Sequence, residues 1–309
     1  MPPTACTLCP RRCAADRTQR AGYCGAGTPM EVASVCLHRG EEPPLNPIVN
    51  LFFAHCNLQC IYCQNHQISA RTLSPNLPVQ AYTPSRLASL IAPLLPQSGG
   101  LLGLVSAAHY ADQLPALISA LHEQGCTPTV VYNSGGYEST DTLRSLEGLV
   151  DIYLPDLKYL SPTIASRYSH APDYPEVATR ALLEMARQVG EGLKTDPYGG
   201  QAYRGLIVRH LVLPGATADS LQCLDWLASH FTPWRLHLSL MAQYYPPHPD
   251  LPPPLDRPVS TEEYSRVCTA ASQLGFTLGW QQELHAADAY RPDFASSGHP
   301  FEHTTPTND

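Results

Sequence analysis

Three cysteines in one short run could supply thiolates to a metal centre. Cys56, Cys60 and Cys63 have the spacing C-x3-C-x2-C, and the run offers no fourth cysteine. An ordinary four-iron cluster uses four cysteine thiolates, so three would leave one iron open to a ligand that is not protein. Structural zinc sites are normally closed by four protein ligands, and the missing fourth ligand therefore favours a chemical role. The alternative is a zinc site completed by His55, His66 or a distant residue.

A second group of four cysteines precedes this run. Cys6, Cys9, Cys13 and Cys24 have the spacing C-x2-C-x3-C-x10-C, and a Gly-Tyr-Cys-Gly turn surrounds the last of them. The pattern predicts a closed four-thiolate site for structural zinc, a single iron as in rubredoxin, or a second iron–sulfur cluster. Free thiols are the alternative. The other cysteines are isolated and are interpreted as small buried apolar residues: Cys36, Cys126, Cys223 and Cys268.

Composition and charge exclude several classes of protein. The chain has 309 residues, of which 43% are hydrophobic, and a formal net charge of −8 without a basic stretch. We therefore expect no nucleic-acid partner. No run reaches the roughly 20 apolar residues of a membrane-spanning helix, and the first residues lack the apolar segment of a signal peptide. Eleven cysteines without a secretion signal indicate metal-binding or free thiols in a cytoplasmic protein.

The elements that must position these residues alternate from residue 48 onward. The apolar pattern predicts strands at 48–54, 101–106, 128–133, 150–156, 205–213 and 235–241. Helices are expected at 114–121, 141–149, 175–189, 218–230 and 261–274. Ser260 is a plausible N-cap of the last helix, with Glu263 three residues on. About six such strand–helix units predict an α/β fold with a parallel sheet, although the pattern does not separate a doubly wound sheet from a barrel.

Polar and sulfur-containing side chains follow the carboxyl ends of these strands. The active sites of α/β barrels gather at that edge of the sheet. The candidates are His55, Ser106, His109, Asn133, Ser134, Asp156, Lys158, Arg209, His210, Met241 and Gln243. His38, Glu41 and Glu42 precede the first strand, and they form either a link into the sheet or a solvated turn.

The cysteine run and several other segments resemble the radical S-adenosylmethionine (SAM) enzymes. The likeness spans residues 5–295, and it is closest to the branch similar to pyruvate formate-lyase activating enzymes, which activate glycyl radical enzymes. The segments that carry it are 56–69, 131–138, 150–159, 184–190 and 209–215.

This resemblance implies a fold and a chemistry. The fold would be a partial (β/α)6 TIM-like barrel over 47–285, with a small Cys-rich metal-binding segment at 1–46 and a tail at 286–309. Cys56, Cys60 and Cys63 would hold a [4Fe-4S] cluster whose open iron binds SAM. The reduced cluster would cleave SAM to methionine and a 5′-deoxyadenosyl radical, which removes a hydrogen atom from a substrate.

The resemblance also implies roles for residues around the cluster. Tyr62 would pack near the adenine of SAM. Asp156 and Lys158 match positions near the SAM carboxylate and a bound cation, and their alternation about Leu157 points both to one side of the strand; a buried ion pair is the alternative reading. The further cofactor-binding candidates are Ser106, His109, Asn133, Ser134, Arg209, Met241 and Gln243.

One motif departs from the family pattern. Activating enzymes carry a Gly-Gly-Glu type motif after the second strand, where it holds the SAM amino group. Here the sequence is Ser106-Ala107-Ala108-His109, and relatives in the branch carry a Pro-Thr pair before this histidine. Backbone carbonyls, Ser106 or His109 would have to hold that amino group instead.

The substrate is not fixed by these motifs. The resemblance implies a backbone glycine of a partner glycyl radical enzyme, and an electron donor of the flavodoxin or ferredoxin type. A small molecule or a peptide is the rival substrate. A non-catalytic iron–sulfur or zinc electron-transfer protein is a third class, which the intact cysteine run and the polar strand ends disfavour.

Overall fold

The fold was taken from a computed structural model, which describes residues 5–198, 200–286, 290–296 and 299–301. The predicted tail, 286–309, is therefore described only in part. In the described residues, no helix combines the length and apolar character needed to cross a membrane.

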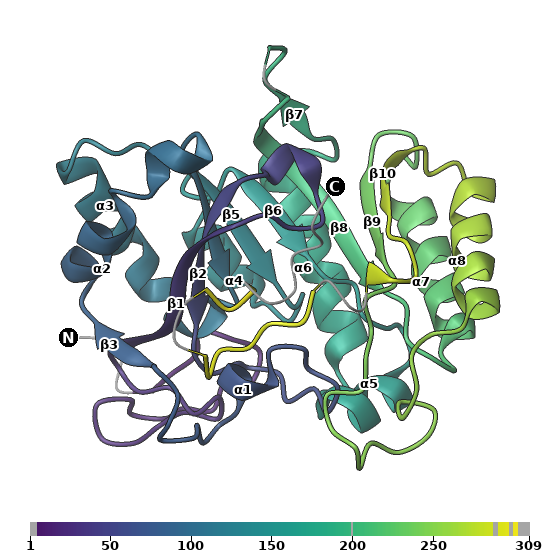
Figure 1. Cartoon of the computed structure of the whole chain (residues 1–309), viewed down its shortest axis with the longest axis horizontal. Coiled ribbons are helices and arrows are strands. Elements are labelled where there is room, and N and C mark those ends of the chain that lie inside the picture. The colour runs from purple at the N-terminus through teal and green to yellow at the C-terminus, as the bar shows by residue number, and fades with distance from the viewer. Residues whose placement is uncertain (1–4, 199, 287–289, 297–298, 302–309) are drawn as a thin grey trace.

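A largely parallel sheet forms the centre of the molecule (Figure 1). In the described residues its order is β10-β9-β8-β6-β5-β4-β2-β1-β3, and β7 pairs with β8. The strands from β10 to β2 along this path run parallel, whereas β1 is antiparallel to β2, and β3 to β1. The strands are β1 (Met30–His38), β2 (Ile48–Phe53), β3 (Gln80–Tyr82), β4 (Leu101–Val105), β5 (Thr129–Ser134), β6 (Ile152–Pro155), β7 (Lys194–Thr195), β8 (Ala202–Leu211), β9 (His237–Met241) and β10 (Leu278–Gln281).

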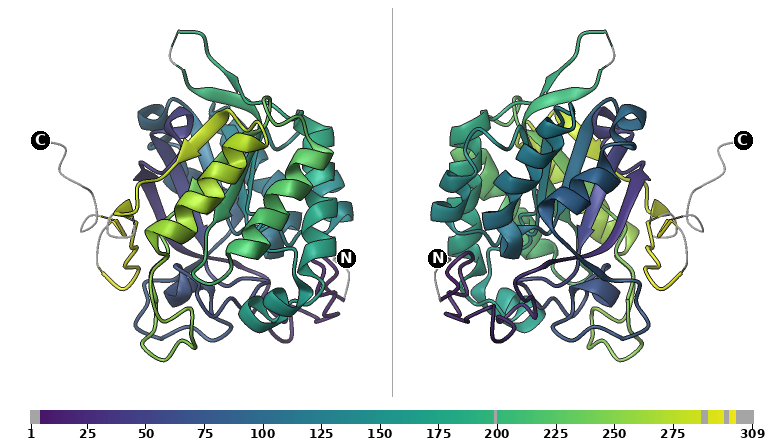
Figure 2. Two further views of the ribbon diagram at one scale, coloured as in Figure 1. Left: turned by 90° about the vertical axis from the view of Figure 1, so that its right-hand side faces the viewer. Right: turned by 90° about the vertical axis from the view of Figure 1, so that its left-hand side faces the viewer.

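Helices flank this sheet. In Figure 1, α2 and α3 lie at the left and α7 and α8 at the right, and Figure 2 shows these two helical sides in turn. The helices are α1 (His66–Ser69), α2 (Pro84–Ile91), α3 (Leu114–Glu123), α4 (Thr140–Ser145), α5 (Pro162–Ser169), α6 (Tyr174–Val189), α7 (Thr217–His230) and α8 (Thr261–Gln273). The mixed α/β fold with a parallel sheet is thus confirmed.

Alternate residues of each strand face different surroundings. Leu102 and Leu104 of β4 belong to the main apolar core, whereas Gly103 lines a cavity on the opposite face. In β5, Tyr132 lies in that core and Asn133 lines the cavity. This period of two follows from the strand pleat. The sheet therefore packs one face against helices and turns the other toward a shared interior.

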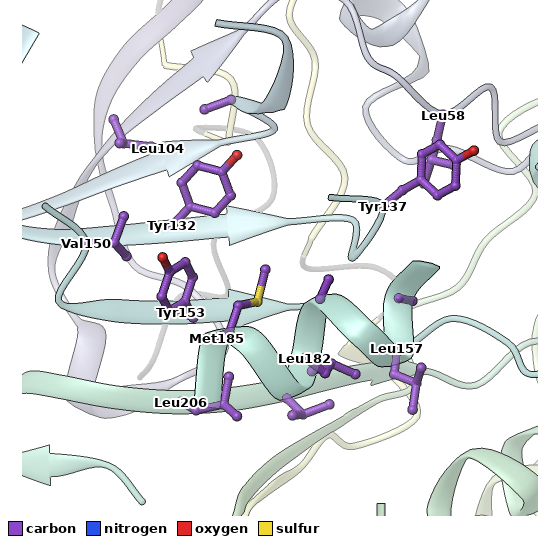
Figure 3. Close-up of a cluster of buried hydrophobic side chains, with 14 of the residues drawn as sticks. Leu58, Leu104, Tyr132, Tyr137, Val150, Tyr153, Leu157, Leu182, Met185 and Leu206 are labelled. Atoms are coloured by element: carbon purple, nitrogen blue, oxygen red, sulfur yellow. The ribbon is translucent and has the colours of Figure 1, made fainter. Parts of the chain in front are cut away.

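The main core fills the space between the sheet and the helices. Figure 3 shows Leu182 and Met185 of α6 beside Tyr153 of β6 and Leu206 of β8, and all four are fully buried. The hydroxyl of Tyr153 donates to Gln188 Oε1 at 2.7 Å. A buried tyrosine needs such a partner for its hydroxyl, so α6 is fixed on the sheet by polar as well as apolar contacts.

The observed elements differ from the sequence prediction mainly at their ends. The helix expected at 141–149 ends at Ser145, followed by a turn in which Gly148 has φ +82°. The predicted N-cap is confirmed, because Ser260 and Glu263 form a capping box at the start of α8. The sequence patterns did not predict β1, β3, β7, β10, α1, α2 and α5.

Glu138, four residues after the end of β5, accepts two hydrogen bonds from side chains of that strand. The Ser134 hydroxyl donates to its Oε1 at 2.6 Å, and the Tyr132 hydroxyl to its Oε2 at 3.2 Å. Burial raises the pKa of Glu138 to about 7, against the lowering effect of these two donors. The carboxyl therefore changes charge near neutral pH while it remains inside the fold.

Replacing Gly136 by alanine is expected to destabilise the protein more than the same change at Gly148. Both residues have positive φ, +79° and +82°, so alanine strains either backbone by roughly 1–2 kcal/mol. A Cβ on Gly136 would also lie 2.2 Å from the backbone oxygen of Asp156, whereas Gly148 has nothing within 4 Å. This overlap adds roughly 1–3 kcal/mol. Equal melting temperatures for the two variants would contradict the tight turn.

Glu138→Gln should become more stable relative to the wild type as the pH rises. An ordinary glutamate loses its proton near pH 4.5, whereas folded Glu138 keeps its proton up to about pH 7. Between these values the folded chain binds more protons than the unfolded chain, so wild-type stability falls with rising pH. Glutamine does not titrate, and the wild type should lose about 3 kcal/mol relative to it over this range. A pH-independent difference in unfolding free energy would refute the buried titration.

Candidate functional site

A cavity of about 200 Å³ lies against the inner face of the sheet. Its lining contains all three cysteines of the central run. It also contains eight of the other predicted site residues: Tyr62, Ser106, Asn133, Asp156, Lys158, Arg209, Met241 and Gln243. These residues come from β5, β8 and β9, the turns after β4 and β6, and the loops after β2 and β9, so the carboxyl ends of the strands meet as predicted from the sequence.

Each cysteine of the loop after β2 has a hydrogen-bonding group beside its sulfur. The backbone N–H of Leu58 donates to Cys56 Sγ at 3.4 Å, and the Ser69 hydroxyl donates to Cys63 Sγ at 3.2 Å. Ser169 Oγ, at the end of α5, lies 2.9 Å from Cys60 Sγ. Donors aimed at sulfur favour thiolates over thiols.

Burial works against these thiolates when no cation is bound. It raises the pKa of Cys56 and Cys60, and it raises the pKa of Cys63 to about 11. The metal-free protein therefore holds three neutral thiols at pH 7. Metal ligands must be deprotonated, so a bound cation would release these protons. Buried thiols with hydrogen-bond donors and a cavity on one side fit an iron–sulfur cluster.

Neither cysteine group is a ready-made metal site as the side chains are placed. Within the described ranges, no three or more His, Cys, Asp or Glu side chains are arranged to hold a metal ion. Metal binding at the central run therefore requires its thiols to rotate toward a common centre, which the cavity leaves room for.

Asp156 and Lys158 form an ion pair beside these cysteines. Lys158 Nζ lies 2.5 Å from Asp156 Oδ2, with the side chains 17% and 21% exposed. Both line the cavity, whereas Leu157 between them is buried in the main core. Burial lowers the pKa of Lys158, but the Asp156 carboxylate and the cysteine sulfurs outweigh it and raise the pKa above its ordinary value. The ammonium therefore stays charged and faces the thiols.

Two strand ends hold residues in the left-handed region. His55 follows β2 with φ +71°, and Ser106 follows β4 with φ +58°. Such backbone is unfavourable for residues other than glycine and occurs often at functional sites. His55 is held by the Ala70 carbonyl (2.9 Å) and Glu31 Oε2 (3.2 Å), while Ser106 lines the cavity.

Two predicted cofactor-binding residues lie away from the cavity lining. His109 is buried, with Nε2 2.8 Å from the Ala54 carbonyl oxygen, and burial lowers its pKa to about 3. It is therefore a neutral side chain that ties the end of β2 to the segment after β4. The Ser134 hydroxyl is occupied by Glu138 and by the Gly136 N–H at 3.0 Å. The sequence placed His109 and Ser134 near strand ends, but the direction of each side chain is set by the fold.

A buried cluster of charges forms another part of the cavity wall. Arg209 Nη2 lies 2.8 Å from Glu41 Oε1, and Arg209 Nε lies 3.2 Å from Glu42 Oε1. Glu42 also accepts from the Ser239 hydroxyl at 2.8 Å. The turn that contains Glu41 and Glu42 is thus a link into the sheet and not a solvated turn. The two adjacent glutamates were the sequence signal for this link.

The two glutamates differ in charge preference. Burial raises the pKa of Glu41, but Arg209 outweighs it and the pKa lies below its ordinary value. Burial raises the pKa of Glu42 to about 7 despite Arg209. One carboxylate therefore neutralises Arg209 while the other titrates near neutral pH.

Tyr62 is fixed by other tyrosines. Its hydroxyl is hydrogen-bonded to that of Tyr159, and its ring meets Tyr168 and Tyr244 edge-on, at 6.3 Å between centroids. Tyr62 is 4% exposed and lines the cavity. The fixed ring of Tyr62 therefore lines the cavity directly before Cys63 in the sequence.

Several described tail residues also reach the cavity. Tyr290, Pro292 and Phe301 line it. Phe294 packs edge-on against Phe52, with centroids 5.2 Å apart. Part of the predicted tail thus packs against β1 and β2.

Comparison with known proteins gives distant likenesses. No protein-family model matches the sequence. An uncharacterized protein of Methanocaldococcus jannaschii is 26% identical over 282 residues, which cover 88% of this chain and 76% of that protein. The solved structure of Streptococcus suis SuiB matches 75% of this chain at 9% identity, with a TM-score of 0.45. HydG, a maturase of the [FeFe]-hydrogenase, matches 75% of this chain at 12% identity, with a TM-score of 0.48. The chain spans about half the length of these two structures, 48% and 51%.

Proposed function

We propose that the protein is a radical SAM enzyme in which Cys56, Cys60 and Cys63 hold a [4Fe-4S] cluster. One observation carries this proposal: the three thiols line the same cavity as the Asp156–Lys158 pair. The described lining residues include no fourth cysteine. A cluster bound here would keep one iron without a protein thiolate. That iron would be open to SAM.

When bound, the cluster and SAM would supply a one-electron cleavage that yields methionine and a 5′-deoxyadenosyl radical able to remove a hydrogen atom from a substrate. The protein's own residues bind and orient. Lys158 places a positive charge beside Cys60 and Cys63 and can pair with a carboxylate. Asp156 offers its carboxylate to an ammonium group or a cation, and Tyr62 offers a fixed ring to the adenine.

The one-sided helical cover supports the finer proposal that the sheet is a partial (β/α)6 barrel. In a doubly wound sheet, helices cover both faces. Here residues such as Asn50, Gly103 and Arg209 instead share one cavity on the uncovered face. An interior lined by alternate residues of successive strands is the arrangement of a barrel.

The activating-enzyme branch supplies the leading substrate, a backbone glycine of a glycyl radical enzyme. What supports it is the sequence resemblance of the segments around Cys56–Cys63, Asp156 and Arg209. Such an enzyme would also need an electron donor of the flavodoxin or ferredoxin type and a reducing, cytoplasmic environment.

One observation favours a second candidate, a small molecule or peptide with a charged group. Glu41, Glu42 and Arg209 line the same cavity as the three cysteines. Buried charges of both signs could bind a polar group that enters the sheet interior. A glycine backbone alone has no charge for them to bind.

Replacing Cys56, Cys60 and Cys63 together by alanine should abolish SAM cleavage. Anaerobically reconstituted and reduced wild-type protein is expected to form 5′-deoxyadenosine, because three thiolates hold the cluster next to the cavity. The measurement is chromatography of the products. Cys126→Ala is the matched control, since Cys126 is an isolated, partly buried cysteine outside the cavity lining. Undiminished 5′-deoxyadenosine from the triple variant would sink the assignment.

Asp156→Asn and Lys158→Met should weaken SAM binding and turnover more than they weaken the fold. Breaking a fully buried ion pair costs about 3–5 kcal/mol, but these side chains keep 21% and 17% of their surface exposed to the cavity. Asparagine preserves volume and methionine preserves much of the apolar stem. We expect at least about tenfold weaker binding in equilibrium dialysis, as for a lost charged hydrogen bond. A sharp fall in melting temperature with unchanged binding and turnover would show a purely structural pair.

A further inference from the structure

The N-terminal cysteines gather into a second thiol cluster. Their sulfurs are free of disulfide bonds. The thiols of Cys6 and Cys13 are hydrogen-bonded to each other, and those of Cys9 and Cys24 interact electrostatically with each other and with Cys6. A Cβ built on Gly22 would lie 3.5 Å from the sulfurs of both Cys13 and Cys24. Four thiols separated by up to 18 residues in sequence therefore lie near one another, and they would have to turn toward a common centre to hold a metal ion.

The backbone of this segment is arranged for thiolates. The N–H of the residue two positions on is aimed at the sulfur in three cases: Ala26 to Cys24 at 3.4 Å, Arg11 to Cys9 and Ala15 to Cys13. The same relation occurs between Leu58 and Cys56 in the central run. Repeated N–H donors to sulfur have no purpose for a small apolar side chain, but they stabilise negative sulfur.

The segment has little regular structure of its own. Residues 5–29 contain no helix or strand, and Arg12 and Ala14 adopt left-handed backbone, with φ +39° and +51°. Short segments with so little regular structure and core are usually held by disulfides or metals. Because these cysteines form no disulfide, a metal is the remaining cross-link.

We propose that Cys6, Cys9, Cys13 and Cys24 bind a single zinc or iron ion in a closed tetrahedral site. With metal–sulfur bonds of about 2.3 Å, neighbouring sulfurs of such a site lie roughly 3.8 Å apart. The sulfurs of Cys13 and Cys24 both lie 3.5 Å from the same point, a Cβ built on Gly22, so small side-chain rotations could bring them to this spacing, whereas a four-iron cluster would hold its sulfurs farther apart. The site does not depend on the radical SAM proposal.

Arg11 connects this site to the cluster-binding loop. Its Nε donates to the Asn57 carbonyl at 3.0 Å, and its Nη1 to the His170 carbonyl at 2.8 Å. Asn57 follows Cys56, and His170 follows Ser169, the partner of Cys60. One guanidinium thus holds the backbone beside two of the three cysteines.

A second contact lies at the ends of the same loop. A Cβ on Gly25 would lie 2.3 Å from the Arg71 carbonyl oxygen and 2.7 Å from His55 Nδ1. The Arg71 guanidinium lies 3.7 Å from the centre of the Tyr23 ring. The turn at Tyr23–Gly25, beside the proposed metal, therefore contacts both ends of the segment 55–71. We infer that Arg11 is a positioning residue, through which the N-terminal site keeps this loop ready for its cluster; this part rests on the proposed function.

The metal site is tested in the full chain carrying Cys56→Ala, Cys60→Ala and Cys63→Ala, titrated anaerobically with Co²⁺. We expect one Co²⁺ per chain, with the tetrahedral d–d bands and the sulfur-to-metal charge transfer of four thiolates. Adding Cys9→Ala and Cys24→Ala should remove this binding. Absence of these bands in the triple variant, while circular dichroism shows a folded chain, would overturn the site.

Metal analysis of the same triple variant as purified identifies the native ion. One zinc, or one iron without inorganic sulfide, supports the proposal. Several irons with matching sulfide would overturn the single-ion site. Because the central cysteines are absent from this variant, its outcome is independent of SAM chemistry.

The positioning role is tested by Arg11→Met against Arg12→Met. Arg12 is the matched control, because its side chain is 70% exposed and its one ion pair within the described residues is with Asp141, at 4.0 Å. Both variants should keep the N-terminal metal. Arg11→Met should lose iron from the central run to a chelator roughly tenfold faster than Arg12→Met, as expected for lost charged hydrogen bonds. Equal rates of iron loss in two folded variants would overturn the role of Arg11.

Discussion

The three buried thiols of the central run, which the proposed cluster would need as thiolates, set the main electrostatic problem of this fold. An unpaired buried charge is strongly unfavourable, and burial raises the pKa of Cys56, Cys60 and Cys63. Two hydrogen-bond donors, the Leu58 N–H and the Ser69 hydroxyl, point at the sulfurs without any metal, and the Lys158 ammonium adds a positive charge nearby. The cation of the proposed cluster would supply the remaining charge. A loop with little regular structure can present three such thiols only if rigid elements hold it from several sides.

The sheet holds the loop from one side, and the N-terminal segment, ordered by its proposed metal, would hold it from the other. The pleat sends Tyr132 and Leu104 into the helix-covered core and Asn133 and Gly103 into the cavity, so apolar burial fixes where the polar side chains point. The Gly135-Gly136 turn packs against the backbone of Asp156 and thereby sets the Asp156–Lys158 pair beside the cysteines. From the other side, Arg11 and Gly25 hold the loop itself. Stability and chemistry are therefore coupled: the same contacts that order the loop also place its charges.

Much of this arrangement follows from sequence patterns, and the exceptions have physical causes. Long apolar strands and helices with clear periodicity were predicted, as were the cysteine run and the capping box at Ser260. Short elements such as β10, which has four residues including a glycine, were not predicted. A segment this short is not long enough to show a periodic pattern. Residue type placed His109 and Ser134 at strand ends, but their direction depends on the Ala54 carbonyl and Glu138, which are brought near only by the fold. The burial of Glu42 against Ser239 spans almost 200 residues and has no local signal.

The most direct measurement of the central claim is electron paramagnetic resonance of the reduced, cluster-loaded protein, recorded without SAM and with SAM carrying ¹⁵N in its amino group. Three protein thiolates leave one iron open, so the cluster signal should change when SAM is added, and a hyperfine coupling to the label should show nitrogen bound at that iron. An unchanged signal without this coupling, in protein with a full complement of iron and sulfide, would contradict the account.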